Sequence, residues 1–213
     1  NEACPRHDLR FVKPGKRETE AIIDSSAYSL KNGAEDLYGR ASSGPLPHRA
    51  YLAEARRKRH VWQPGDYHYI ILEHSATDGH WGETYQLVSL GEPKPEYVKA
   101  MRAVDEAIRA AAAAIKPGAT VGEVADASDR LLAEAGYAAP RQPGAPARAI
   151  GHSQGLDVWE FPRIAADDPT IILPGMRFNL HPAVALADGA VITHCDCWIS
   201  TETGARRLYT VPG

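Results

Sequence analysis

Apolar and polar positions alternate along this chain with two periods, one helical and one extended. Residues 96–115 have the helical period, with one apolar stripe made of Val98, Met101, Val104, Ile108 and Ala112. Residues 84–90 and 191–200 alternate with a period of two, which predicts strands. Residues 69–72 and 178–181 are short apolar runs that each follow a Pro-Gly turn, and they predict two further strands.

A repeat organises these elements. The motif Lys-Pro-Gly ends at Gly15 and again at Gly118, and a glutamate and a glycine follow each copy at equal intervals. The matched pairs are Glu20 with Glu123 and Gly33 with Gly136. Residues 18–32 and 121–135 lie inside these matches as amphipathic stretches closed by a glycine, which predicts two equivalent helices.

The Pro-Gly turns before the two strands repeat in the same order, at Gly65 and Gly175. They are 110 residues apart, whereas Gly15 and Gly118 are 103 apart, so the halves match apart from a short insertion. Two ordered matches with shared spacing predict a duplicated helix-then-strand unit.

The half-repeats cover about residues 12–90 and 115–210. A helix over 96–115 precedes the second half, but only a short polar stretch precedes the first. We therefore expect a single domain over residues 1–213 that lacks its first helix and any N-terminal domain. A missing N-terminal segment or a second chain is an expected partner.

Composition excludes several classes of protein. Lys and Arg number 24 against 27 Asp and Glu, a formal net charge of -3, so a general nucleic-acid binder is not expected. No apolar run is long enough to cross a membrane. Three cysteines, Cys4, Cys195 and Cys197, cannot form a disulfide framework, which favours a reducing, cytoplasmic setting.

Three motifs carry the chemistry. Residues 151–163 begin Gly-His-Ser-Gln-Gly-Leu-Asp, residues 173–182 read Leu-Pro-Gly-Met-Arg-Phe-Asn-Leu-His-Pro, and residues 196–204 end in Thr-Glu-Thr-Gly. Together they resemble the creatinase/aminopeptidase/prolidase (M24-type) family. The resemblance covers nearly the whole chain. It implies an α+β pita-bread fold, in which pseudo-twofold helix-strand units share a curved antiparallel sheet.

The departures from the family fall at its metal site. The family's peptidases hold two metal ions with two Asp, one His and two Glu. Matched residue by residue, the five slots are Ile71 (Leu72 when counted back from Gly79), Glu83, His152, His181 and Cys195. Because a bridged pair of hard ions depends on carboxylates, the resemblance implies a degraded dinuclear site and no conventional aminopeptidase.

Metal-independent acid–base chemistry on a small molecule is the first hypothesis, and it needs no cofactor. The family's creatinase uses a histidine as general base in C–N hydrolysis, and His48 matches that region; a lyase or cyclase reaction is related. We expect His48, His152, His181 and Glu83 to be catalytic. The expected substrate contacts are Trp159, as an apolar wall, with Cys195, Trp81 and Arg163.

Two alternatives stay open. Glu83, His152, His181 and Cys195 have the composition of a mononuclear Zn²⁺ or Fe²⁺ site in a hydrolase. The fold also occurs in relatives that bind peptides or proteins without catalysis. For Cys195 and Cys197, the alternative to a role in chemistry is that they are small buried hydrophobic residues. An enzyme should bring its histidines and Glu83 within proton-transfer reach of one another, whereas a binding module need not. A homodimer is expected from the resemblance only.

Overall fold

The structure, a computed structural model, describes residue 7 and residues 9–47, 60–137 and 148–208. Its first half contains α2 (Glu18–Lys31), β1 (Leu37–Gly44), β2 (Tyr67–Ser75) and β3 (Trp81–Ser89). Two helices follow, α4 (Pro95–Ala114) and α5 (Val121–Glu134). The second half contains β4 (Gly151–Ser153), β5 (Glu160–Ile164), β6 (Arg177–Leu180), β7 (Ala183–Ala185), β8 (Val191–Thr193), β9 (Asp196–Ser200) and β10 (Ala205–Arg207).

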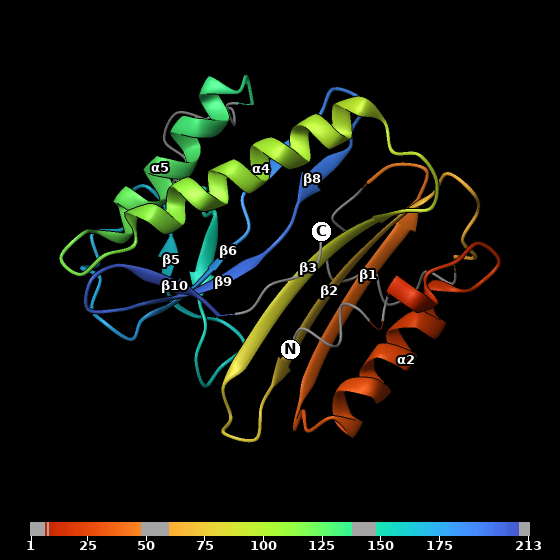
Figure 1. Cartoon of the computed structure of the whole chain (residues 1–213), viewed down its shortest axis with the longest axis horizontal. Helices are drawn as coiled ribbons and strands as arrows, with labels where there is room; N and C mark the ends of the chain where they lie inside the picture. The colour runs from red at the N-terminus through yellow and green to blue at the C-terminus, as the bar shows by residue number, and fades with distance from the viewer. Residues whose placement is uncertain (1–6, 8, 48–59, 138–147, 209–213) are drawn as a thin grey trace.

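Antiparallel strands form the floor of the molecule. One sheet has the order β1-β2-β3, a second has the order β10-β9-β6-β4-β5, and β7 pairs with β8. An antiparallel bridge between Tyr85 and Cys195 joins β3 to the start of β9, so the two sheets meet edge to edge. Helices α4 and α5 lie over the strands of the second half, and α2 lies beside β1 (Figure 1).

Matching hydrogen bonds confirm the duplication. Gly15 N donates to Trp62 O at 2.8 Å, and Gly118 N donates to Ile172 O at 3.0 Å, at the same place in each half. The glycines with positive φ also fall into matched pairs: Gly15 with Gly118, Gly33 with Gly136, Gly65 with Gly175, and Gly79 with Gly189. Because L side chains rarely adopt this conformation, the paired glycines fix equivalent turns in both halves.

Helix positions agree closely with the sequence pattern. Helix α5 begins at a capping box in which Thr120 Oγ1 accepts from Glu123 N and the Glu123 carboxylate accepts from Thr120 N. Helix α4 starts at Pro95, the position where proline costs no hydrogen bond. Its buried face is rotated from the expected stripe: Val104, Ile108 and Ala112 are buried, but Val98 and Met101 are only partly covered.

One expected strand is interrupted. Residues 191–200 were expected to form a single strand, but the structure divides them into β8 and β9. The break occurs because β8 pairs with β7 in a separate small sheet, whereas Cys195 turns to pair with Tyr85 of β3. The expectation of one continuous strand is therefore wrong, and the break is what brings the two halves together.

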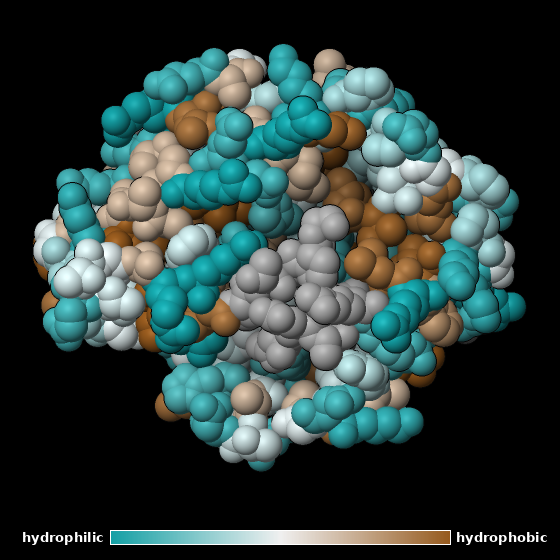
Figure 2. Space-filling model, viewed as in Figure 1, coloured by the Kyte–Doolittle hydropathy of each residue, from teal (hydrophilic) through white to brown (hydrophobic). Residues whose placement is uncertain are grey.

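The main core lies between α4, α5 and the second sheet. Large apolar side chains from the strands, including Ile164, Phe178, Leu180 and Ile192, pack there with the buried alanines of α4. Hydrophilic side chains and smaller apolar patches share the face of the molecule drawn in Figure 2. Among the helices that the structure describes, none combines the length and apolar character needed to cross a bilayer.

Gly151 is the tightest point of this architecture and gives a test of it. A Cβ at this position would lie 1.9 Å from Asn179 O of the neighbouring strand. We expect Gly151→Ala to lower the free energy of unfolding by about 3 kcal/mol, because β4 must move away from β6. Gly204→Ala, where nothing lies within 4 Å of the new Cβ, should change it by less than about 0.5 kcal/mol. Urea unfolding of both variants measures the difference, and equal stabilities would contradict the packing.

Candidate functional site

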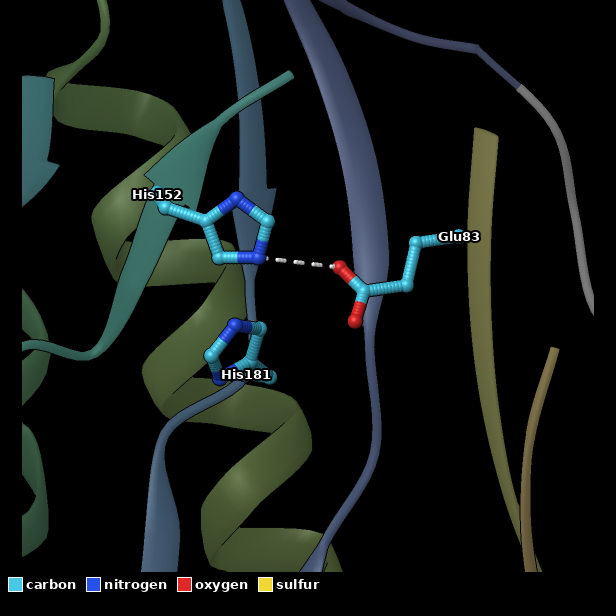
Figure 3. Close-up of side chains that lie close together, drawn as sticks. All are labelled: Glu83, His152 and His181. Carbon is cyan, nitrogen blue, oxygen red and sulfur yellow. Dashed lines mark ion pairs between the residues drawn. The ribbon is translucent and has the colours of Figure 1, made fainter. Parts of the chain in front are cut away.

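Three buried side chains converge where the two halves meet. Glu83 comes from β3, His152 from β4, and His181 from the residue after β6 (Figure 3). One carboxylate oxygen and one nitrogen from each imidazole all lie within 4.8 Å of one another. The structure thus brings together three of the four side chains expected to be catalytic. The fourth, His48, lies outside the described residues.

Strand register explains why these side chains share one face. His152 is paired with Arg163 of β5 on one side and with Asn179 of β6 on the other, and Asn179 is paired with Cys197 of β9. Directly opposite residues of antiparallel strands point to the same face. His152, Asn179 and Cys197 therefore form a row across the second sheet, and the β3–β9 bridge places Glu83 beside it.

A backbone carbonyl orients His152. Its Nδ1 lies 2.8 Å from Ser153 O, and because a carbonyl only accepts, Nδ1 must carry the proton. The other nitrogen, Nε2, faces Glu83 Oε2 at 3.4 Å, as the dashed line in Figure 3 marks. This tether fixes the ring and its tautomer and leaves Nε2 directed at the centre of the group.

Glu83 is held from the opposite side by Asn179. Asn179 Nδ2 donates to Glu83 Oε2 at 2.8 Å, and Cys197 Sγ lies 2.7 Å from Asn179 Oδ1, which assigns the amide orientation. Burial alone would raise the pKa of Glu83. However, the hydrogen bond with His152 and the positive charges of His181 and His152 hold that pKa well below its ordinary value. The buried Glu83 carboxylate is therefore anionic.

Aromatic rings position the remaining parts of the group. The His181 ring stacks on Tyr85, with centroids 5.1 Å apart, and lies 5.3 Å from the His152 ring. The ring centroids of Trp159 and His152 are 5.9 Å apart, and Trp159 packs edge-on against Phe161. Trp159 is 45% exposed. Trp159 thus lies beside the group, and its role as an apolar wall for a substrate stays a prediction.

Cys195 does not join the group of possible metal ligands. Its Sγ lies 3.8 Å from Glu83 Oε2, but the residue is fully buried among Tyr69, Ile71, Tyr85 and Cys197. Burial, the Cys197 thiol and the Glu83 charge raise the pKa of Cys195 well above that of a free thiol. Cys195 is therefore a protonated, packed side chain, and contact with a substrate would require this cluster to open.

The remaining expected substrate contacts lie at the edges of the site. Trp81 begins β3 two residues before Glu83 and is partly exposed. Its backbone N–H donates to Gly155 O at 2.8 Å, which ties β3 to the segment after His152. Arg163 is also partly exposed and lies directly opposite His152 in the register of β4 and β5. Both residues lie near the group, and neither belongs to it.

Sequence reasoning missed Asn179 and Tyr85. Both could have been found by strand alternation, since Asn179 is two residues before His181 and Tyr85 is two residues after Glu83. It also missed Glu73, a buried carboxylate directly opposite Glu83 that lies 3.7 Å from Arg40 and 3.5 Å from Gln154. No sequence signal indicated that Arg40, on β1, would approach Glu73.

These surroundings do not fit a bridged pair of metal ions. Ile71 offers no ligand atom and packs in the apolar cluster with Cys195, while the buried carboxylate Glu73 lies near Arg40 and is not among the converging ligand atoms of the described residues. The group of Glu83, His152 and His181 does fit a single ion, because its three ligand atoms converge from three separate backbone segments.

Two pseudo-equivalent halves with helices over one curved antiparallel floor, and a polar group where the halves meet, define a pita-bread protein. The sequence pattern of Metallopeptidase family M24 matches residues 3–207, and the chain belongs to that family. The family and the fold expected from the resemblance are both confirmed.

Relatives and solved structures agree with this assignment. The chain is 29% identical to the "Probable dipeptidase PepE" of Mycobacterium tuberculosis over 95% of its own length and 52% of that protein. It is 26% identical to the "Xaa-Pro dipeptidase" of Pyrococcus furiosus, over 94% of its length and 56% of that protein.

Among structures, dipeptidase PepE from Mycobacterium ulcerans superimposes with a TM-score of 0.83 at 26% identity, covering 99% of this chain and 56% of that one. The prolidase from Pyrococcus furiosus gives 0.85 at 24% identity, covering 100% and 61%, and shows the shared fold. The chain spans about half the length of the curated relatives it matches.

Asn179→Leu tests the hydrogen bond that holds Glu83. The variant removes the amide that donates to Glu83 Oε2 and leaves a buried carboxylate oxygen without that donor. We expect it to lower the free energy of unfolding by about 2 kcal/mol. The control Asn32→Leu removes an exposed amide bond to Tyr28 O and should cost about 0.5 kcal/mol. If thermal and urea unfolding give the same small loss for both, Asn179 does not support the site.

Proposed function

We propose that this chain carries the reaction centre of a hydrolase that cleaves a C–N bond in a small substrate of dipeptide size. The convergence of Glu83, His152 and His181 carries the proposal. Three ionisable groups from distant segments meet in a buried place where two sheets join. Burying such groups costs free energy of folding, and clusters of this kind are typical of functional sites. Membership in Metallopeptidase family M24 supports hydrolysis as the reaction class.

The names of the relatives support a short peptide as substrate. Both the PepE protein and the Pyrococcus furiosus protein are called dipeptidases, and the latter acts on Xaa-Pro. A dipeptide is small enough for a centre whose ligand atoms are buried, and its scissile bond is an amide C–N bond. Trp159 and Phe161 offer it an apolar surface beside His152.

The side chains of the centre have separable tasks. Glu83 provides a fixed negative charge, which Asn179 aims toward the two histidines. Ser153 O accepts a hydrogen bond from His152 Nδ1, so Nε2 is the nitrogen directed at Glu83. Trp159 lies on one side of the centre, with its ring centroid 5.9 Å from that of His152, and offers a substrate an apolar contact there.

Metal-independent acid–base chemistry is the less favoured version of this reaction. It needs His152 to exchange a proton with Glu83 or with a substrate through a direct hydrogen bond. The separation of 3.4 Å between Nε2 and Oε2 is longer than the usual 2.7–3.2 Å of an N–H···O bond, so the hydrogen bond between His152 and Glu83 is a weak one. A single divalent ion held by Glu83, His152 and His181 would supply positive charge that polarises the carbonyl of the scissile bond.

The same convergence favours an enzyme over a peptide-binding module. In a binding module the histidines have no reason to lie within reach of one buried carboxylate. Here the nitrogens of His152 and His181 do so. The general base expected at His48 stays a prediction, because His48 lies outside the described residues.

A substrate panel tests the proposed activity. Purified protein is assayed with Xaa-Pro dipeptides, other dipeptides and N-acyl amino acids, and release of the free amine is measured by mass spectrometry. We expect hydrolysis of at least one class, and we expect Glu83→Gln and His181→Ala to lower kcat/KM by a factor of about 100 or more.

His80→Ala is the matched control, because that side chain is 51% exposed on the turn before β3. It should retain the activity of the unchanged protein. Absence of hydrolysis across the panel, with folding intact, would contradict the proposal. Equal rates for Glu83→Gln and His80→Ala would show that the reaction does not take place at this centre.

A further inference from the structure

We propose that Glu83, His152 and His181 bind one divalent ion of the zinc class, in place of the two-ion centre that the resemblance to the family's peptidases implies. The inference rests on the proposed function in one respect only, since it assigns an ion to the same three side chains. It depends on their distances, their hydrogen bonds and the two apolar slots beside them.

The spacing of the ligand atoms fits an ion better than a hydrogen bond. Zn²⁺ binds imidazole nitrogen and carboxylate oxygen at roughly 2.0–2.1 Å in tetrahedral geometry, so two ligands of one ion lie about 3.4 Å apart. His152 Nε2 and Glu83 Oε2 are 3.4 Å apart. The His181 nitrogen lies within 4.8 Å of both atoms, so binding one ion would require it to move closer to them.

The groups around these ligands hold them in the form that binds metal. His152 donates a hydrogen bond from Nδ1 to Ser153 O, as metal-binding histidines commonly do, so Nε2 is the nitrogen directed at the place of the ion. Asn179 Nδ2 donates to Glu83 Oε2, and the carboxylate is buried, so a cation at this place would offset the cost of burying its charge.

Among the described residues, a second ion has no set of converging ligands, and the buried carboxylate Glu73, opposite Glu83, lies beside Arg40 and Gln154 instead. Ile71 and Cys195 fill the slots where the family's peptidases have carboxylates, and both pack in one apolar cluster. Removal of this negative charge disfavours two adjacent dications. The ion that remains has two imidazoles and one carboxylate, a set that suits Zn²⁺ or Co²⁺ far better than Mg²⁺, Ca²⁺ or Mn²⁺.

Three protein ligands leave one position of a tetrahedral ion open. Cys195 Sγ is near Glu83, yet it is not among the ligand atoms that converge, and it packs in an apolar cluster with Ile71 and Tyr85. An open position is the feature that distinguishes catalytic zinc sites from structural ones. The site therefore takes a Lewis-basic ligand, such as water or a carbonyl oxygen, as its fourth partner.

Metal titration of the chelator-treated protein tests the inference. Zn²⁺ is added alone and followed by calorimetry, and the metal retained after desalting is measured by mass spectrometry. We expect one equivalent, with MnCl₂ binding much more weakly. His152→Ala, His181→Ala and Glu83→Gln should each weaken Zn²⁺ binding by at least about 100-fold, whereas the exposed His80→Ala should not change it.

Cobalt substitution identifies the ligands without relying on activity or on unstable variants. With Co²⁺ in the unchanged protein, we expect the strong visible absorption of a four-coordinate site and no sulfur-to-cobalt charge-transfer band. Two equivalents, no retained metal, or a sulfur band that disappears in Cys195→Ala would each overturn the inference. One equivalent of zinc without any hydrolysis contradicts only the proposed function. Hydrolysis by protein that retains no zinc contradicts only the metal site.

Discussion

The antiparallel contact between β3 and β9 is the interaction on which the site depends. The bridge between Tyr85 and Cys195 joins the two duplicated halves edge to edge. Without it, Glu83 in the first half would lie on an unrelated sheet edge, far from His152 and His181 in the second. The break between β8 and β9 contributes to this contact, because it allows Cys195 to pair with Tyr85 of β3. Duplication gives the chain two similar sheets, and this contact makes them one surface with a polar centre.

The duplicated architecture was predictable from the sequence because its signals are local. The Lys-Pro-Gly motifs, the capping box at Thr120 and the paired glycines each act over a few residues, and their spacing shows which turns are equivalent. The buried face of α4 was less predictable: alanines on both sides of the stripe allow a rotation that packing against α5, β7 and β8 decides.

The centre itself could be predicted only in part. Glu83, His152 and His181 occupy motif positions, so their types and order indicated a shared site. Asn179 and Ser153 O, which orient them, act through register and hydrogen bonds that no motif encodes. The exclusion of Cys195 depends on the apolar cluster around it, which combines side chains from β2, β3 and β9. Contacts of this kind depend on sheet register and cannot be predicted from the spacing of residues in the sequence.

The kind of ion that suits the centre depends on the two carboxylate positions that Ile71 and Cys195 occupy in this chain. A family member that keeps its carboxylates can neutralise two dications, whereas here Glu83 is the only carboxylate in the group of converging ligands that the described residues form. Two neutral imidazoles and one anion leave a net charge suited to one ion, and they favour nitrogen-preferring metals. On the proposal made above, the change from Asp and Glu to Ile, His and Cys alters both the number and the kind of ion, while the fold stays the same.

Anomalous X-ray diffraction at the zinc absorption edge, from crystals grown with Zn²⁺, tests this account most directly. The account predicts a single anomalous peak enclosed by Glu83, His152 and His181, about 2 Å from each ligand atom, with no sulfur contact. Two peaks about 3.5–4 Å apart would show a dinuclear centre and contradict it. The absence of any peak among these three side chains would contradict it equally.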